Sequence, residues 1–343
     1  MSDASERAGA GGARAGGGGV AGGGARASEI FAPGMLGETT ALVTGGGTGL
    51  GKATALELVR CGACVTIAGR REDVLAEAAA EIEGIAGARA GAGDSGGGAG
   101  DGGGGGGGGG ATVDGRSAAA EAAAVRTVVG DIREPADARR MIGSVLERDG
   151  RLDVLVNNAG GQFFGPAELI AAKGWRAVWR LNVEGMLNLT EAAYDLAFAG
   201  GMGGRIVNVT LSPHHGMPGM AHSGAARATV EALTRELAER WAGDGVTCSA
   251  IAVGTFDTEV MVKYPAPVRA GMSRSVPVQR LGTPPEHAWL VALLASPLGG
   301  ALSGSTVTLD GARDNWFGPW PPPGLVDEGG AVPVEERKVG AGE

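Results

Sequence analysis

The sequence has few cysteines, little positive charge and no long hydrophobic run. Cys61, Cys64 and Cys248 are its only cysteines, and an odd number without a signal peptide fits a reducing compartment. No uncharged apolar run reaches about 18 residues, so no membrane span is expected. The net charge is −9, which argues against nucleic acid as the main partner. No metal site is expected, because the adjacent His214 and His215 do not share one ligand face.

Glycine, by contrast, is abundant, with 67 glycines in 343 residues. The segments 1–30 and 84–124 are rich in Gly and Ala, and neither can bury enough apolar surface to offset its ordering entropy. We therefore expect a disordered tail over 1–30 and a disordered insertion over 84–124. One domain spans 31–312 in this interpretation, and a tail rich in Pro, Gly and charge follows over 313–343.

Strand-like and helix-like segments alternate through the rest of the chain. The hydrophobic pattern predicts strands at 41–43, 63–68, 125–129, 152–156, 205–209, 246–253 and 306–309. It predicts helices at 53–59, 72–82, 135–147, 174–199, 221–241 and 284–295. Such alternation indicates an α/β fold with a single doubly wound parallel sheet of the Rossmann type, with helices on both faces.

A glycine-rich turn joins the first strand to the first helix. Its sequence, T-G-G-G-T-G-L-G at 44–51, has the glycine spacing G-x-x-x-G-x-G. Such a turn directs backbone N–H groups and the positive end of a helix dipole at a phosphate. A glycine-rich turn that reflects composition alone is the competing interpretation. The residues expected to bind a dinucleotide here are Thr44, Gly45, Gly47, Thr48, Gly49, Leu50 and Gly51.

The carboxyl ends of the later strands supply further candidate cofactor ligands. Arg70 and Arg71 follow the second strand, where a carboxylate would bind the ribose of NAD, and guanidinium suits a 2′-phosphate. This favours NADP(H), although two solvated arginines opening a helix remain the alternative. Asp131 follows the third strand and can accept from the adenine amino group. The other expected cofactor ligands are Ile132, Asn158, Ala159, Gly160, Gly254 and Thr258.

These motifs together resemble the short-chain dehydrogenase/reductase superfamily over about residues 36–312, apart from the insertion. The resemblance rests on the glycine turn, N-N-A-G at 157–160, L-N-V around Asn182, R-I-V-N-V at 205–209 and D-G at 310–311. Within the superfamily the chain is similar to the peroxisomal trans-2-enoyl-CoA reductases. F-A-P-G-M-L at 31–36, G-G-Q-F at 160–163, H-S-G-A-A-R-A at 222–228 and D-N-W at 314–316 carry that likeness.

The chain departs from the superfamily at its usual catalytic positions. Most members use a serine together with Y-x-x-x-K, but here Ser223 stands at the Tyr position and Arg227 at the Lys position. The usual serine falls at or beside Leu211, and the two tyrosines, Tyr194 and Tyr264, lie elsewhere. The resemblance therefore implies that carbonyl reduction by a Tyr/Lys relay is absent.

Reduction of a C=C bond conjugated to a thioester does not need that relay. Hydride goes to the β-carbon, and hydrogen-bond donors stabilise the enolate. Ser223 can donate to the thioester oxygen or the nicotinamide ribose, Arg227 can hold ribose hydroxyls, and Asn182 can anchor a water. The expected catalytic residues are Ser223, Arg227, Asn182, His222 and Ser212, with His214 and His215 as further candidate proton sources.

The sequence thus predicts an NADPH-dependent trans-2-enoyl-CoA reductase of fatty acid metabolism. A 2,4-dienoyl-CoA reductase, or a catalytically inactive NADP-binding or scaffold protein, is the alternative. The expected substrate is an acyl-CoA thioester, and residues 255–280 are the expected substrate lid. The helices at 174–199 and 221–241 could build a dimer or tetramer. Resemblance favours a peroxisomal location, although the chain ends without an S-K-L-like tripeptide; the alternative is cytoplasmic.

Overall fold

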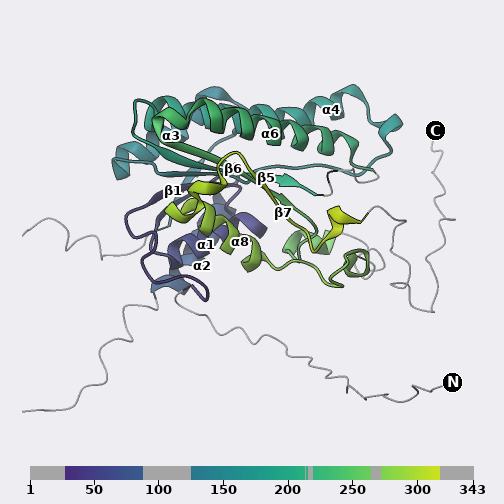
Figure 1. Ribbon diagram of the computed structural model, residues 1–343, viewed down its shortest axis with the longest axis horizontal. Helices are drawn as coiled ribbons and strands as arrows, with labels where there is room; N and C mark the ends of the chain where they lie inside the picture. The colour runs from purple at the N-terminus through teal and green to yellow at the C-terminus, as the bar shows by residue number, and fades with distance from the viewer. Residues whose placement is uncertain (1–27, 88–124, 213, 215–218, 264–271, 317–343) are drawn as a thin grey trace, which may run out of the picture.

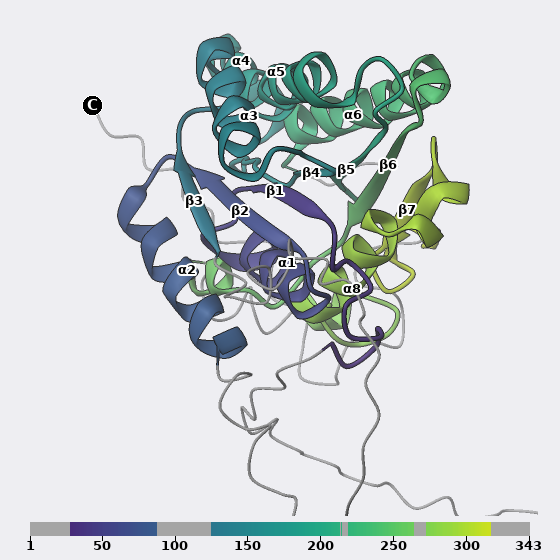
Figure 2. The same ribbon diagram turned by 90° about the vertical axis from the view of Figure 1, so that its left-hand side faces the viewer.

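The computed structural model describes residues 28–87, 125–212, 214, 219–263 and 272–316. Seven parallel strands form one sheet in the order β3-β2-β1-β4-β5-β6-β7 (Figure 2). The strands are β1 (Thr40–Thr44), β2 (Cys64–Gly69), β3 (Arg126–Val129), β4 (Val154–Asn157), β5 (Gly204–Leu211), β6 (Val246–Val253) and β7 (Thr306–Leu309). The predicted doubly wound sheet is confirmed. Most of the two expected tails and of the Gly-rich insertion lies outside the described residues, so the domain boundaries stay predictions.

Helices cover both faces of this sheet. The helices α1 (Gly49–Arg60), α2 (Glu72–Gly87) and α8 (Pro284–Ala295) lie on one face, and α3 (Pro135–Asp149), α4 (Ala172–Trp179), α5 (Gly185–Ala193) and α6 (Ala221–Arg240) lie on the other (Figure 1). No described helix has the length and apolarity that crossing a membrane requires.

Alternating side chains of the central strand β1 serve the two cores. Ala41 and Val43 belong to the cluster packed beneath α1 and α8, whereas Leu42 belongs to the cluster beneath α3 and α5. All five residues of β1 are buried, as expected for a parallel strand covered on both faces. Because β1 pairs with β2 on one side and β4 on the other, the chain reverses its winding at β1. A crevice at the carboxyl ends of β1 and β4 is the usual ligand position in such a sheet.

The helix expected at 174–199 is present as one continuous helical stretch over 172–198, but two π-helical segments lie within it. Between α4 and α5 the chain forms a π-turn, η3 (Arg180–Glu184), and a second one, η4 (Tyr194–Phe198), follows α5. The side chain of Asn182 explains the first π-helical segment, because its Nδ2 donates to the carbonyl of Val178 at 2.8 Å. That carbonyl would accept the backbone N–H of Asn182 in a regular helix, and π-turns of this kind are frequent at functional sites.

The segment 88–124 joins α2 to β3. Because all strands run parallel, this connection meets the sheet at the edge opposite the carboxyl ends of the strands. The backbone N–H of Val125 donates to Oε1 of Glu83 at 3.1 Å, so the start of β3 is tied back to α2. The end of α2 and the start of β3 therefore lie on the side of the sheet opposite the carboxyl ends of β1 and β4.

Candidate cofactor and active site

A threonine and an asparagine join the ends of β1 and β4. Thr44 Oγ1 accepts from the backbone N–H groups of Asn158 and Ala159 at 3.0 and 2.9 Å. The Asn158 amide Nδ2 donates to the carbonyl of Thr44 at 2.9 Å. These bonds fix the two strand ends beside each other, and they hold the start of the glycine turn in place.

The glycine turn packs so closely that larger residues would not fit. Gly45 and Gly49 have φ of 65° and 54°, a region that favours glycine. A Cβ on Gly51 would overlap the carbonyl of Gly45 and lie 2.5 Å from Asn158 Nδ2. A Cβ on Gly47 would lie 2.9 Å from Val74. The glycines therefore bring the start of α1 to the crevice, where its backbone N–H groups can bind a diphosphate, and the turn fits a dinucleotide.

A carboxylate already contacts this helix start. Oε2 of Glu259, in the 3-10 helix η6 (Glu259–Lys263), accepts from the backbone N–H of Gly49 at 3.0 Å. Its Oε1 lies 3.1 Å from Nζ of Lys52, which also pairs with Glu81 at 3.0 Å. Burial raises the pKa of Glu259, but the bonds from Gly49 and Lys52 outweigh it and lower the pKa. Sequence reasoning missed Glu259, although it directly follows Thr258, which lies close to Gly49.

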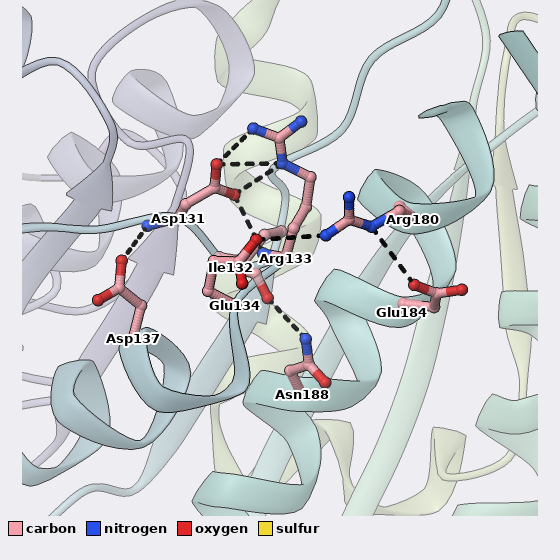
Figure 3. A network of polar contacts seen from close by, with 8 residues as sticks. All are labelled: Asp131, Ile132, Arg133, Glu134, Asp137, Arg180, Glu184 and Asn188. Atoms are coloured by element: carbon pink, nitrogen blue, oxygen red, sulfur yellow. Dashed lines mark hydrogen bonds and ion pairs between the residues drawn. The ribbon is translucent and has the colours of Figure 1, made fainter. Parts of the chain in front are cut away.

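The loop after β3 is held by a network of polar contacts (Figure 3). The guanidinium of Arg133 donates to both carboxylate oxygens of Asp131, and Nε lies 2.9 Å from Oδ1. These bonds lower the pKa of Asp131 to about 2, with a smaller contribution from the charge of Arg70. Asp131 was expected to meet adenine, and the structure adds Arg133 at the same place. Arg70 and Arg71 are exposed.

The same loop is tied to the helices that carry Asn182. Nδ2 of Asn188 donates to the carbonyl of Ile132 at 2.9 Å, and Arg180 pairs with Glu134 at 3.2 Å (Figure 3). A Cβ on Gly185 would lie 2.7 Å from the Ile132 side chain. Ile132 is thus placed by packing and by its backbone, so the loop after β3 is fixed to α5.

Asn182 is buried and its amide binds the chain that follows β4. Nδ2 donates to the carbonyl of Gly161 at 2.8 Å, and Oδ1 accepts from the backbone N–H of Gly161 at 3.2 Å. With the bond to Val178 described above, the side chain already has three protein partners. Asn182 therefore holds the chain after β4 in place, and its expected role as a water anchor stays a prediction.

The structure brings Arg227 and Gly160 together. Nη1 of Arg227 donates to the carbonyl of Val209 at 2.6 Å, and a Cβ on Gly160 would overlap the guanidinium. Burial lowers the pKa of Arg227 to about 10, so the group stays charged at neutral pH. Among the described residues no carboxylate pairs with it. A half-buried cation of this kind fits a ligand that carries hydroxyl or anionic groups.

His222 and Ser223 lie at the start of α6 and are buried to 1% and 0% exposure. Neither the Ser223 hydroxyl nor either ring nitrogen of His222 has a hydrogen-bond partner within the part of the chain that the structure describes. The ring of His222 makes edge-on contacts with Phe163 and with Trp175, at centroid distances of 4.4 and 6.0 Å. Burial lowers the pKa of His222, because it disfavours the charged imidazolium relative to the neutral imidazole.

Ser212 is buried but is engaged elsewhere. Its hydroxyl donates to the carboxylate of Asp310, directly after β7, and no bond joins it to Ser223 or Arg227 among the described residues. A Cβ on Gly254 would lie 2.6 Å from that of Asp310, so Gly254 serves the close approach of β6 and β7. The expected catalytic use of Ser212 thus gains no support from this geometry.

His214 is paired with two carboxylates, those of Asp314 and Glu231. Its Nδ1 lies 2.5 Å from Oδ2 of Asp314, and its Nε2 lies 3.1 Å from Oε2 of Glu231. Glu231 in turn accepts from the hydroxyl of Thr210 at 2.8 Å. Burial lowers the pKa of His214, but the Asp314 hydrogen bond and the charges of both carboxylates outweigh it and raise the pKa. His215 lies outside the described residues.

The fold and the crevice define a dinucleotide-binding α/β protein, and comparison with known proteins gives its family. Residues 111–312 match the family described as Enoyl-(Acyl carrier protein) reductase, and residues 39–94 match the family described as short chain dehydrogenase. A probable 2,4-dienoyl-CoA reductase of Bacillus subtilis (strain 168) is 31% identical, over 82% of this chain and 97% of its own. The chain belongs to the short-chain dehydrogenase/reductase family.

Two further relatives agree with that assignment. The peroxisomal 2,4-dienoyl-CoA reductase of Danio rerio is 28% identical, over 83% of this chain and 84% of its own. The structure of a citronellol catabolism dehydrogenase (AtuB) from Pseudomonas aeruginosa PAO1 is 32% identical, covers 83% of this chain and 98% of its own, and has a TM-score of 0.64. The protein is therefore an oxidoreductase of a family that binds a nicotinamide dinucleotide.

Proposed function

We propose that the protein is an NADPH-dependent trans-2-enoyl-CoA reductase of fatty acid metabolism. One observation carries the proposal: Ser223 and Arg227 stand in place of the Tyr/Lys pair, Ser223 is buried at the start of α6, and the half-buried guanidinium of Arg227 packs against Gly160. The Ser223 hydroxyl has no hydrogen-bond partner among the residues that the structure describes, and leaving such a group unpaired costs about 1–3 kcal/mol unless a ligand binds it. The names of the relatives support acyl-CoA chemistry, and Arg70 beside Asp131 supports a 2′-phosphate.

The residues around Ser223 fit the reduction of a conjugated C=C bond. Bound NADPH would supply hydride to the β-carbon. The Ser223 hydroxyl would donate to the thioester oxygen as it becomes an enolate. The positive charge of Arg227 would hold the ribose hydroxyls and favour negative charge nearby. Asn182 would keep Gly161 in place, so that the chain after β4 can wall the site.

The direct test is to mix the protein with NADPH and hexenoyl-CoA and to follow the near-ultraviolet absorbance of NADPH. Turnover that is much faster with NADPH than with NADH is expected. Ser223→Ala and Arg227→Ala should each lower kcat/KM, since both would touch substrate or cofactor. An inert wild-type protein across enoyl chain lengths would contradict the assignment.

Reduction of 2,4-dienoyl-CoA is the second candidate, and the names of the relatives from B. subtilis and D. rerio favour it. Offering a dienoyl-CoA in the same assay separates the two activities. A protein that binds NADPH in calorimetry but reduces neither thioester would be an inactive binding protein. The peroxisomal or cytoplasmic location of the protein and its assembly into a dimer or tetramer stay predictions.

A further inference from the structure

Two aromatic side chains beside His222, those of Phe163 and Trp175, have no role in the proposed reaction. Phe163 lies in the segment after β4, and Trp175 lies in α4. Both rings approach His222 edge-on, at interplanar angles of 61° and 69°. Yet Phe163 is 43% exposed and Trp175 is 36% exposed. Two large apolar rings thus cover a buried imidazole on one side and present free surface on the other.

We call Phe163 and Trp175 the aromatic wall. Phe163 packs against Gly174 at the start of α4. A Cβ on Gly174 would lie 2.9 Å from the ring of Phe163 and 3.3 Å from Ile170, so Phe163 rests directly on the start of α4. Three residues before it in the chain, Gly160 contacts the Arg227 guanidinium. The short segment from Gly160 to Phe163 therefore links the Arg227 guanidinium to the aromatic wall.

The buried imidazole indicates that the wall faces a ligand. His222 is 1% exposed, and both its ring nitrogens lack partners within the described residues. Because buried polar groups are normally hydrogen-bonded, an apolar surface that contains such a group suits a ligand with a polar end and an apolar body. Ser223, the next residue, is the expected donor to a thioester oxygen.

We propose that the Phe163–Trp175 wall binds the apolar acyl chain of the substrate, while Ser223 and His222 bind its thioester end. The inference rests on the proposed reductase function and adds a preference for long, unbranched apolar acyl chains over short ones. An acyl chain laid along the two rings covers their exposed faces. Each further methylene of the acyl chain that is buried in this way adds a similar increment to the binding free energy.

The test compares crotonyl-CoA with dodecenoyl-CoA in wild type, Phe163→Ala and Phe163→Leu. Phe163→Ala should lower the ratio of kcat/KM for dodecenoyl-CoA to that for crotonyl-CoA by about tenfold, because most of one aromatic contact is lost. Phe163→Leu keeps an apolar side chain and should change the ratio by less than about threefold. Leu298→Ala, which removes a 69% exposed side chain beyond α8, should leave it unchanged.

Calorimetry with dodecanoyl-CoA, a saturated analogue, gives a second readout that needs no turnover. Phe163→Ala should weaken its binding by a similar factor while NADPH binding stays as in wild type. If the variant lowers kcat/KM equally for both chain lengths, Phe163 is only structural and the inference is wrong. If wild type reduces neither thioester and does not bind dodecanoyl-CoA, the reductase proposal itself fails, which is a different outcome.

Discussion

The contact of Glu259 with the start of α1 predicts that this residue weakens cofactor binding. Its carboxylate accepts the Gly49 N–H at 3.0 Å, one of the donors that a diphosphate would use. Replacing it by Glu259→Gln removes a negative charge from the anion site. The side chain is 59% exposed, so a dielectric near that of water applies, and two unit charges about 4 Å apart then repel by about 1 kcal/mol. The dissociation constant for NADPH should fall about fivefold.

Isothermal titration calorimetry of wild type and Glu259→Gln measures this directly. The matched control is Glu81→Gln, which removes the other carboxylate paired with Lys52 but does not contact Gly49. It should change NADPH affinity by less than about twofold. The gain in Glu259→Gln should shrink at high salt, because exposed charges are screened. Equal or weaker binding by Glu259→Gln would refute the idea that the carboxylate competes with the cofactor.

Three other expected outcomes follow from the site. Gly160→Ala forces a methyl group against Arg227; it should lower the free energy of unfolding by about 1–3 kcal/mol in denaturant titrations and weaken cofactor binding. His214 has a raised pKa, so its ion pairs stabilise the fold fully below an unfolded pKa of about 6.5. This contribution is lost as pH rises through the folded pKa, and unfolding of His214→Gln followed against pH should lack that loss. Asp131 has a pKa lowered to about 2, so its charged form stabilises the fold. The difference in the free energy of unfolding between wild type and Asp131→Asn should be present above about pH 4 and vanish as pH falls through about 2. Acid-unfolding curves that coincide for the two proteins would contradict a stabilising ion pair between Asp131 and Arg133.

The sequence was sufficient for the sheet because its signals are local. Short apolar runs predicted each strand, and the glycine turn before α1 was recognisable from eight residues. The bounds of β6, β7 and α8 agree with the prediction residue for residue. These elements depend on neighbours within a few positions, and their apolar pattern leaves little choice of conformation.

The missed features depend on residues that are distant in the chain. Nothing near Ser212 indicates that Asp310 will take its hydroxyl, and nothing near Gly49 indicates that Glu259 will reach it. The π-turn at Asn182 arises because a side-chain amide competes for a backbone carbonyl, which helical periodicity does not reveal. Arg133 could have been found, since it stands two residues after Asp131, within reach of its carboxylate.

The bond from Val125 to Glu83 has a practical consequence for engineering. This bond joins the end of α2 to the start of β3, on the side of the sheet opposite the carboxyl ends of the strands. Sequence length between these two anchors can therefore change without altering how the sheet is assembled, because loop closure depends only weakly on length. A fluorescent label or a fused binding module could therefore be inserted between the end of α2 and the start of β3, while the bond from Val125 to Glu83 keeps these two elements together.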